Sequence, residues 1–146
     1  MSRFVVDASV AVKWVVEESG SAEALEVLEC RPLSSPDLLI AECTNILWKK
    51  VKRSELDRDE AIMAARLIQQ SDVEILPTRA LMERALELAV KLDHAAYDCI
   101  YLSLAFENDW SFVTADERLV RKLKQASQER FNTKVLSLTE AANSPL

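Results

Sequence analysis

The chain has 146 residues and a net charge of −6 at pH 7, and 49% of its residues are hydrophobic and 29% charged. This length is most simply one domain over residues 1–146 that buries about two-thirds of its unfolded surface, and the composition excludes a disordered chain. The acidic balance argues against a protein that coats nucleic acids nonspecifically, because such binding needs clustered Lys and Arg.

Short β-rich runs alternate along the chain with longer helical patterns. The expected strands are Phe4–Val6, Pro32–Ser34, Val73–Leu76, Ser111–Val113 and Lys134–Leu136. The expected helices are Val10–Val16, Ala22–Cys30, Pro36–Arg53, Arg58–Ser71, Arg79–Leu92, Ala95–Glu107 and Glu117–Gln128. Strands joined through helices predict an α/β fold, with a mainly parallel five-stranded sheet flanked by helices on both faces. The ligand site of such a sheet lies at the carboxyl ends of its strands.

Two acidic residues follow expected strand ends. Asp7 ends the apolar run FVV, where a charged group is costly to desolvate unless a cation or hydrogen-bond donors meet it. Asp116 follows the strand that ends at Val113. Ordinary helix initiation is an alternative for both regions, since Thr114 and Glu117 have capping-box spacing and Ser9 could cap the helix after Asp7.

Two further acids interrupt helices that are otherwise apolar on the same face. Glu42 lies in a stripe with Leu39 and Ile46, although a glutamate at the edge of such a stripe can bend outward to water. Asp98 is the only charge between Ala95 and Phe106, where the alternative is an acid favoured by the dipole of the first helical turn. Tyr97 and Tyr101 could supply hydroxyl donors nearby.

A parallel sheet could bring Asp7, Glu42, Asp98 and Asp116 into one cleft. Clustered carboxylates repel one another and take up protons unless a cation is present. Oxygen-only ligands select Mg²⁺ or Mn²⁺, with substrate phosphate completing the shell. We therefore expect a divalent metal to meet Asp7, directly or through water.

The small numbers of glycine, histidine and cysteine residues exclude or disfavour several other kinds of site. The one glycine, Gly20, rules out P-loop, dinucleotide-binding and G-x-S-x-G motifs, which need several glycines. Ser-His-Asp chemistry would have to use the one histidine, His94, which is more often a surface or capping residue. The three cysteines are widely spaced and fit reduced thiols in a cytoplasmic protein better than disulfides or zinc ligands. Neither a signal peptide nor an apolar run of about 20 residues is visible.

The sequence resembles the PIN domain family, and within it the VapC-type toxins of toxin–antitoxin pairs. The resemblance rests on VVDASVAVKW, PDLLIAECTNIL, LDHAAYDCIYLSLA and FVTADERL. It implies a PIN-like fold and a metal-dependent endoribonuclease, usually a homodimer and usually silenced by a small antitoxin. The family's acidic set falls on Asp7, Glu42, Asp98 and Asp116, and its small hydroxyl residues fall on Ser9 and Thr114.

Three other functions compete with this interpretation. A HAD-type phosphatase also places Asp after its first strand, but it needs a second Asp two residues on, where this chain has Ser9. A receiver domain needs paired acids at the first strand's end and a Lys after the last strand, and neither is clear. A non-catalytic module that kept the PIN fold would lack affinity for Mg²⁺ and Mn²⁺.

Contacts to substrate and to a second copy are predicted mostly on the helix that carries Glu42, with Lys13 on the expected helix Val10–Val16 and Ile62–Leu67 on the expected helix Arg58–Ser71. Candidate RNA contacts are Lys13, Lys49, Lys50, Lys52 and Arg53, although cations at a helix C-terminus also serve its dipole and solubility. Candidate residues of a self-interface are Ile46, Leu47, Val51 and Ile62–Leu67.

Overall fold

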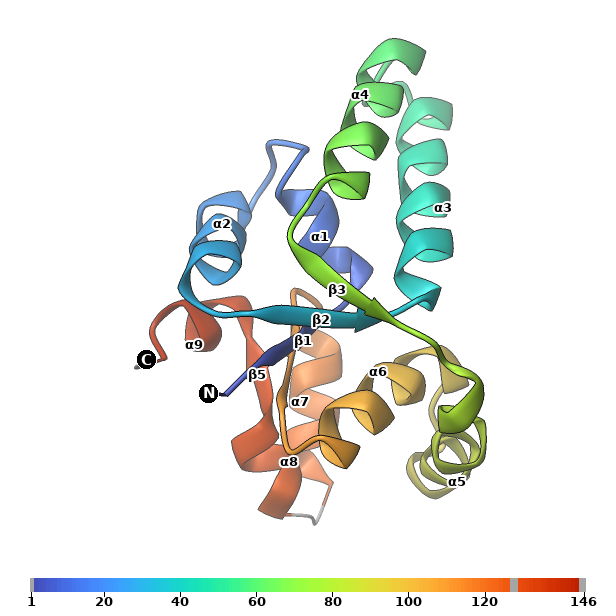
Figure 1. Cartoon of the computed structure of the whole chain (residues 1–146), viewed down its shortest axis with the longest axis vertical. Coiled ribbons are helices and arrows are strands. Elements are labelled where there is room, and N and C mark those ends of the chain that lie inside the picture. Colours follow the sequence, from blue (N-terminus) through green and yellow to red (C-terminus); the bar gives the residue numbers. More distant parts are fainter. Residues whose placement is uncertain (1, 127–128, 145–146) are drawn as a thin grey trace.

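A computed structural model gives the structure of residues 2–126 and 129–144 (Figure 1). Strands and helices alternate through this part of the chain, as the sequence pattern predicts. The strands are β1 (Phe4–Val6), β2 (Leu33–Pro36), β3 (Val73–Leu76), β4 (Ser111–Thr114) and β5 (Val135–Ser137). The helices are α1 (Ala8–Lys13), α2 (Ser21–Cys30), α3 (Leu38–Lys52), α4 (Arg58–Gln69), the 3₁₀ turn η1 (Arg79–Leu81), α5 (Met82–Leu92), α6 (Ala96–Glu107), α7 (Glu117–Gln125), α8 (Glu129–Lys134) and α9 (Leu138–Ala142).

The five strands form one sheet in the order β3-β2-β1-β4-β5, and every neighbouring pair is parallel. The predicted parallel five-stranded α/β sheet is thereby confirmed. The chain builds outward from β1 to β2 and β3 on one side, then returns to add β4 and β5 on the other. A crevice forms where the order reverses, outside the carboxyl ends of β1 and β4, and this is where parallel sheets bind ligands.

Helices cover both faces of the sheet because alternate residues of each strand point to opposite sides. Val5 and Phe112 pack against α5, α6 and α7 on one face. Phe4 and Val6 pack against α1, α2 and α9 on the other.

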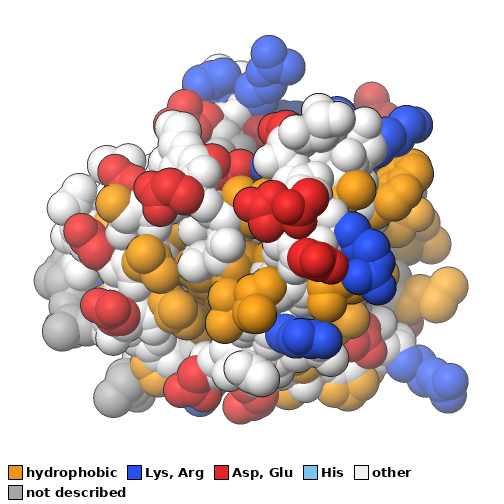
Figure 2. Space-filling model, turned by 90° about the horizontal axis from the view of Figure 1, so that it is seen from above, with side chains coloured by type: hydrophobic (Ala, Val, Ile, Leu, Met, Phe, Trp, Pro, Cys, Tyr) orange, Lys and Arg blue, Asp and Glu red, His pale blue; other side chains and the backbone are white. Residues whose placement is uncertain are grey.

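Helices α3 and α4 pack together and project from the end of the sheet (Figure 1). Leu39, Cys43 and Leu47 of α3 are buried with Ala64 and Ile68 of α4. Viewed from this end of the molecule, hydrophobic side chains gather among acidic ones (Figure 2). Some apolar side chains of this helix pair therefore stay exposed, including Trp48 of α3 and Met63 of α4.

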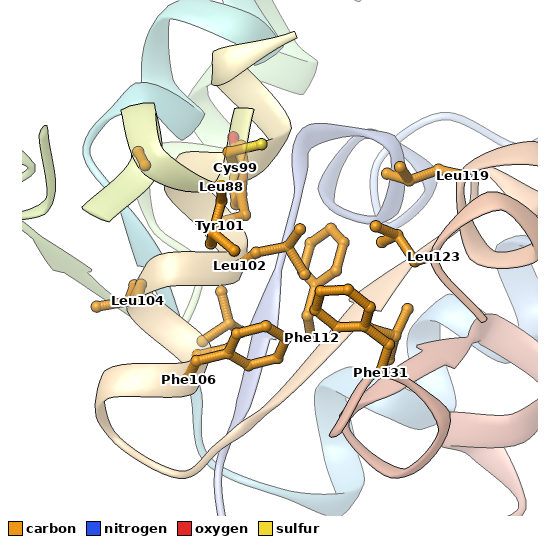
Figure 3. Packing of buried hydrophobic residues seen from close by; sticks show 14 of the residues in the cluster. Leu88, Cys99, Tyr101, Leu102, Leu104, Phe106, Phe112, Leu119, Leu123 and Phe131 are labelled. Atoms are coloured by element: carbon orange, nitrogen blue, oxygen red, sulfur yellow. The ribbon is translucent and has the colours of Figure 1, made fainter. Parts of the chain in front are cut away.

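The largest buried cluster packs α6 against α5, α7, α8 and the sheet (Figure 3). The rings of Tyr101 and Phe112 are 6.0 Å apart, and Phe106 stacks on Phe131 with ring centroids 5.3 Å apart. Helix α6 is buried from Tyr101 to Phe106, and its first turn, which carries Asp98, is the more exposed end.

Several element boundaries differ from the predictions. Pro36 ends β2 and does not open α3, and the last strand is Val135–Ser137, one residue later than expected. Helices α8 and α9 were not predicted, since each is too short for a periodic pattern to be evident. The helix predicted over Glu117–Gln128 ends at Gln125, and residues 127–128 lie outside the described residues.

Within the described ranges, no helix is both long enough and apolar enough to cross a membrane.

Candidate functional site

Asp7 leaves β1 in extended conformation and caps α1, so its carboxylate is held at the centre of the crevice. It is only 7% exposed. Ser9 Oγ donates to Oδ1 at 2.5 Å, Thr114 Oγ1 donates to Oδ2 at 2.5 Å, and the Val10 amide donates to Oδ1 at 3.3 Å. Burial raises the pKa of Asp7 to about 6, although the hydrogen bonds from Ser9 and Thr114 oppose that rise.

The hydroxyls of Ser9 and Thr114 also tie the two central strand ends together. The Ala115 amide donates to Ser9 Oγ at 3.0 Å, and the Asp116 amide donates to Thr114 Oγ1 at 3.1 Å. Thr114 is thus fully occupied as the buried last residue of β4. The alternative that Ser9 and Thr114 cap these helices does not hold, because Asp7 caps α1 and Asp116 caps α7.

Glu42 faces the same crevice from α3, whose first residue follows β2 closely. The hydroxyl of Tyr101 donates to Glu42 Oε1 at 2.5 Å. Burial and the charge of Asp98 raise the pKa of Glu42, and the Tyr101 bond lowers it. Burial and Glu42 raise the pKa of Tyr101, so its phenol stays protonated as a donor. Tyr97, the other hydroxyl suggested by the sequence, is 63% exposed.

Asp98 lies in the first turn of α6 and is bound by His94. His94 Nε2 is 2.6 Å from Asp98 Oδ2, and Lys122 Nζ is 2.9 Å from His94 Nδ1. Because the ammonium of Lys122 can only donate, Nδ1 accepts, and we assign the ring proton to Nε2, which donates to Asp98. His94, expected to be a surface or capping residue, is partly exposed just before α6, and its ring links Lys122 to a site carboxylate. Its spacing of four residues from Asp98 is the signal that could have found it.

Asp116 is exposed at the start of α7, and its Oδ1 accepts from the amides of Arg118 and Leu119, both at 3.1 Å. This arrangement leaves Asp116 at the mouth of the crevice, next to the buried Asp7.

All four acids line one pocket of about 300 Å³ at the carboxyl ends of the strands. The other residues of this acid pocket are Ala8, Ser9, Asn45, Ile46 and Lys49. The charge of Asp98 raises the pKa of both Asp7 and Glu42, so the carboxylates interact electrostatically.

The donors of the acid pocket fit a hard divalent cation, since four carboxylates supply only oxygen and repel one another. Their present spacing is too open for direct ligation, because within the described residues no three Asp, Glu, His or Cys side chains are arranged to hold a metal ion. A cation would therefore draw the carboxylates inward or be held partly through water, as Mg²⁺ usually is.

The cations predicted to contact RNA do not form one patch. Lys13 and Lys50 both pair with Glu18, at 3.2 and 2.8 Å, and Lys52 lies 5.3 Å from the ring centroid of Trp48. Lys49 lines the acid pocket, and Arg53 is exposed at the end of α3.

The sequence interpretation missed two arginines of α7, Arg118 and Arg121. Both are exposed and line a second cleft that shares Asp116 with the acid pocket. Their spacing of three residues, directly after a candidate site acid, is the sequence signal that could have pointed to them.

Comparisons with known proteins agree with this architecture. The family model described as the PIN domain matches residues 4–124. The chain is 29% identical over 123 residues to Ribonuclease VapC3 of Pyrobaculum aerophilum, covering 82% of this chain and 94% of that protein.

Among solved structures, PAE2754 from Pyrobaculum aerophilum is similar with a TM-score of 0.69 and 24% identity, over 98% of this chain and 91% of that one. VapC20 from Mycobacterium tuberculosis, described as a Sarcin-Ricin loop cleaving toxin, has a TM-score of 0.61 and 14% identity, over 89% and 93%. VapBC2 from Rickettsia felis, bound to a DNA fragment from its promoter, has a TM-score of 0.63 and 15% identity, over 92% and 98%. At these identities the structural likeness establishes the fold alone.

Proposed function

The chain belongs to the PIN domain family, and from that premise we propose that it is a VapC-like toxin, an endoribonuclease that depends on Mg²⁺ or Mn²⁺. The observation that carries the proposal is the acid pocket, where Asp7, Glu42, Asp98 and Asp116 meet at the strand ends. The similarity to Ribonuclease VapC3 over most of both chains supports RNA as the substrate.

In this proposal the four carboxylates would hold the cation, directly or through water. A divalent cation bound there would lower the pKa of water and offset charge on the scissile phosphate. Ser9 and Thr114 fix the orientation of Asp7 and favour its ionised form, which is the form that binds metal.

Glu42 is our candidate for the group that accepts the proton of the attacking water. Its pKa is raised, and the Tyr101 hydroxyl holds Oε1 in place. Water attack of this kind does not use the ribose 2′-hydroxyl, so the products would carry a 5′-phosphate and a 3′-hydroxyl.

The structure gives no support to phosphatase chemistry of the HAD type. That mechanism needs an acid two residues after Asp7, and the residue there is Ser9, whose hydroxyl donates to Asp7. The non-catalytic alternative predicts that the protein binds neither metal nor RNA.

Cleavage of a pool of structured RNAs tests the proposal. Purified protein with Mg²⁺ or Mn²⁺ should cut the pool, leave 5′-phosphates, and stop when EDTA is added. Asp98→Asn protein purified in the same way controls for contaminating nucleases. Cleavage that survives full chelation in metal-free buffer would show that the activity does not depend on a metal.

We further propose that the partner of the chain is a small antitoxin, bound at the cleft between α4 and the segment that follows α1. This cleft has a volume of about 840 Å³ and an apolar floor that includes Val16, Met63 and Leu67. Four acids besides the lysine-paired Glu18 stand around the floor: Glu17, Glu55, Asp59 and Glu60. An amphipathic segment with basic flanks matches both features.

A homodimer is proposed through a different surface, the apolar stripe on α5. Met82, Leu86 and Val90 are 74%, 58% and 75% exposed and follow one another at helical spacing. Residues of both signs lie beside the stripe, namely Glu83, Glu87 and Lys91, so two copies related by a twofold axis could pair opposite charges. Leu47, which the sequence placed in a self-interface, is only 4% exposed and is buried with α1 and α4.

A cytoplasmic location completes the proposal. Cys30, Cys43 and Cys99 are all free thiols, and such thiols persist in a reducing compartment.

A further inference from the structure

A second cleft opens beside the acid pocket, on the side of α7. Its volume is about 560 Å³, and its walls include Lys13, Arg118 and Arg121. Asp116 lines both this cleft and the acid pocket. A polymer that reacts among the four acids can therefore extend past Asp116 into this second cleft, which we call the arginine cleft.

Within the described residues Arg118 and Arg121 have no carboxylate partner, in contrast to three lysines nearby. Lys13 and Lys50 pair with Glu18, and Lys124 of the same helix pairs with Glu140. For the side chains of Arg118 and Arg121, no hydrogen bond or ion pair occurs with any residue that the structure describes. The two guanidinium groups stand one helical turn apart and are free to bind an anion.

Phosphate is the anion that suits this geometry. A guanidinium presents its donors as a planar fork that matches the oxygens of phosphate. The nearest phosphates to a scissile bond in RNA belong to the neighbouring nucleotides of the same strand. Continuity with the acid pocket through Asp116 makes the RNA strand the source of the anion, in preference to a free ion or a protein carboxylate.

We propose that the arginine cleft binds a backbone phosphate of a nucleotide that flanks the scissile bond, through Arg118 and Arg121. The inference rests on the proposed ribonuclease function and extends it to how the substrate strand is positioned. Glu23 and Glu117 also line the cleft and repel a phosphate, so the site is confined to the arginine side. Neutralising Glu117 should accordingly tighten RNA binding.

The test compares Arg118→Gln, Arg121→Gln and the double variant with Arg84→Gln. Arg84 is an exposed arginine of α5 that lines neither the acid pocket nor the arginine cleft, so its variant removes the same charge elsewhere. Binding of a labelled single-stranded RNA of mixed sequence is measured over a salt series in the Asp98→Asn background, where the RNA is not cut. Cleavage kinetics of the structured RNA pool are measured with the native acids.

Each α7 variant should weaken RNA binding about fivefold to tenfold at low salt. Each should also reduce the slope of log affinity against log salt by about 0.7, the value for one phosphate contact on a single strand. Because the arginines lie outside the acid pocket, KM should rise more than kcat falls. Arg84→Gln should match its parent, and Glu117→Gln should bind RNA more tightly.

Three results would overturn the inference. The first is a parent that binds and cuts RNA while the α7 variants match Arg84→Gln. The second is α7 variants that bind inorganic phosphate less tightly than the parent but keep their RNA affinity, which would make the cleft a small-anion site off the strand's path. The third is that a co-expressed antitoxin no longer inhibits the α7 variants, although these variants bind RNA as tightly as the parent does. A parent that neither binds nor cuts RNA would overturn the proposed function itself, and this inference with it.

Discussion

Thr114 Oγ1 lies 2.5 Å from Asp7 Oδ2, so the last residue of β4 holds the carboxylate that ends the neighbouring strand β1, across 107 residues of sequence. This bond joins two parallel strands at the point where the sheet order reverses. It also means that hydroxyl donors partly satisfy Asp7 before any cation arrives. Burial nevertheless raises the pKa of Asp7, so the free-energy cost of ionising this carboxyl group should be measurable in the metal-free protein.

The free energy of unfolding of Asp7→Asn, measured relative to that of the wild type, should increase as pH rises from about 4 to 7. The folded pKa of Asp7 is about 6 and its usual value is 3.8, so the proton is bound more tightly in the folded state. That contribution to stability is complete below pH 3.8 and is lost as pH rises through about 6. The difference between variant and wild type should change by about 3 kcal/mol at most, at about 1.4 kcal/mol per pKa unit.

The measurement for Asp7→Asn is urea unfolding in EDTA at a series of pH values. A stability difference that does not change with pH would show that Asp7 is not held with a raised pKa.

Asp98→Asn should abolish most RNA cleavage without destabilising the metal-free protein. The asparagine oxygen can still accept from His94 Nε2, while the negative charge that raises the pKa of Asp7 and Glu42 disappears. Activity should fall by several orders of magnitude, since charge is lost where transition-state charge is stabilised. Added Mn²⁺ should stabilise the variant less than the wild type, because metal binds the folded state more weakly.

Paired melting and cleavage assays, with and without Mn²⁺, check the Asp98 prediction. A variant that is destabilised yet fully active would show that Asp98 only stabilises the first turn of α6 and has no role in cleavage.

Tyr101→Phe should weaken Mn²⁺ binding and lower the free energy of unfolding by about 1 kcal/mol. The substitution removes the donor that lowers the pKa of Glu42, so Glu42 holds its proton more tightly and competes less well for a cation. Isothermal titration with Mn²⁺ at neutral pH measures the effect. Tyr97→Phe is the matched control, because Tyr97 is on the same helix and is 63% exposed. Equal Mn²⁺ affinities for the two variants would contradict this role of Tyr101.

Light scattering at micromolar concentration should give a mass of about 33 kDa, twice the 16.5 kDa of one chain. Leu86→Glu should shift the mass toward the monomer, because it buries a charge in the apolar stripe of α5. Leu25→Glu places the same charge on α2, where Leu25 is 40% exposed, and should leave the dimer intact. A wild type that stays monomeric at high concentration would rule out the dimer.

The sequence by itself determined the α/β class, the approximate positions of all five strands and the placement of four acids near strand ends. These features depend on local patterns, such as the apolar run that ends at Asp7 and the single charge in the apolar helix around Asp98. The resemblance to the PIN domain family, confirmed by the family match over residues 4–124, rests on the same local segments.

Only the tertiary structure decided which groups meet each acid and which cations remain available. Tyr101 reaches Glu42 across 59 residues, and Thr114 reaches Asp7 across 107. Lys13 and Lys50 looked available in the sequence but share Glu18, whereas Arg118 and Arg121 drew no attention and have no carboxylate partner among the residues that the structure describes. Such pairings depend on how strands and helices far apart in the chain pack together, and no local pattern encodes the distance between two side chains that the fold brings into contact.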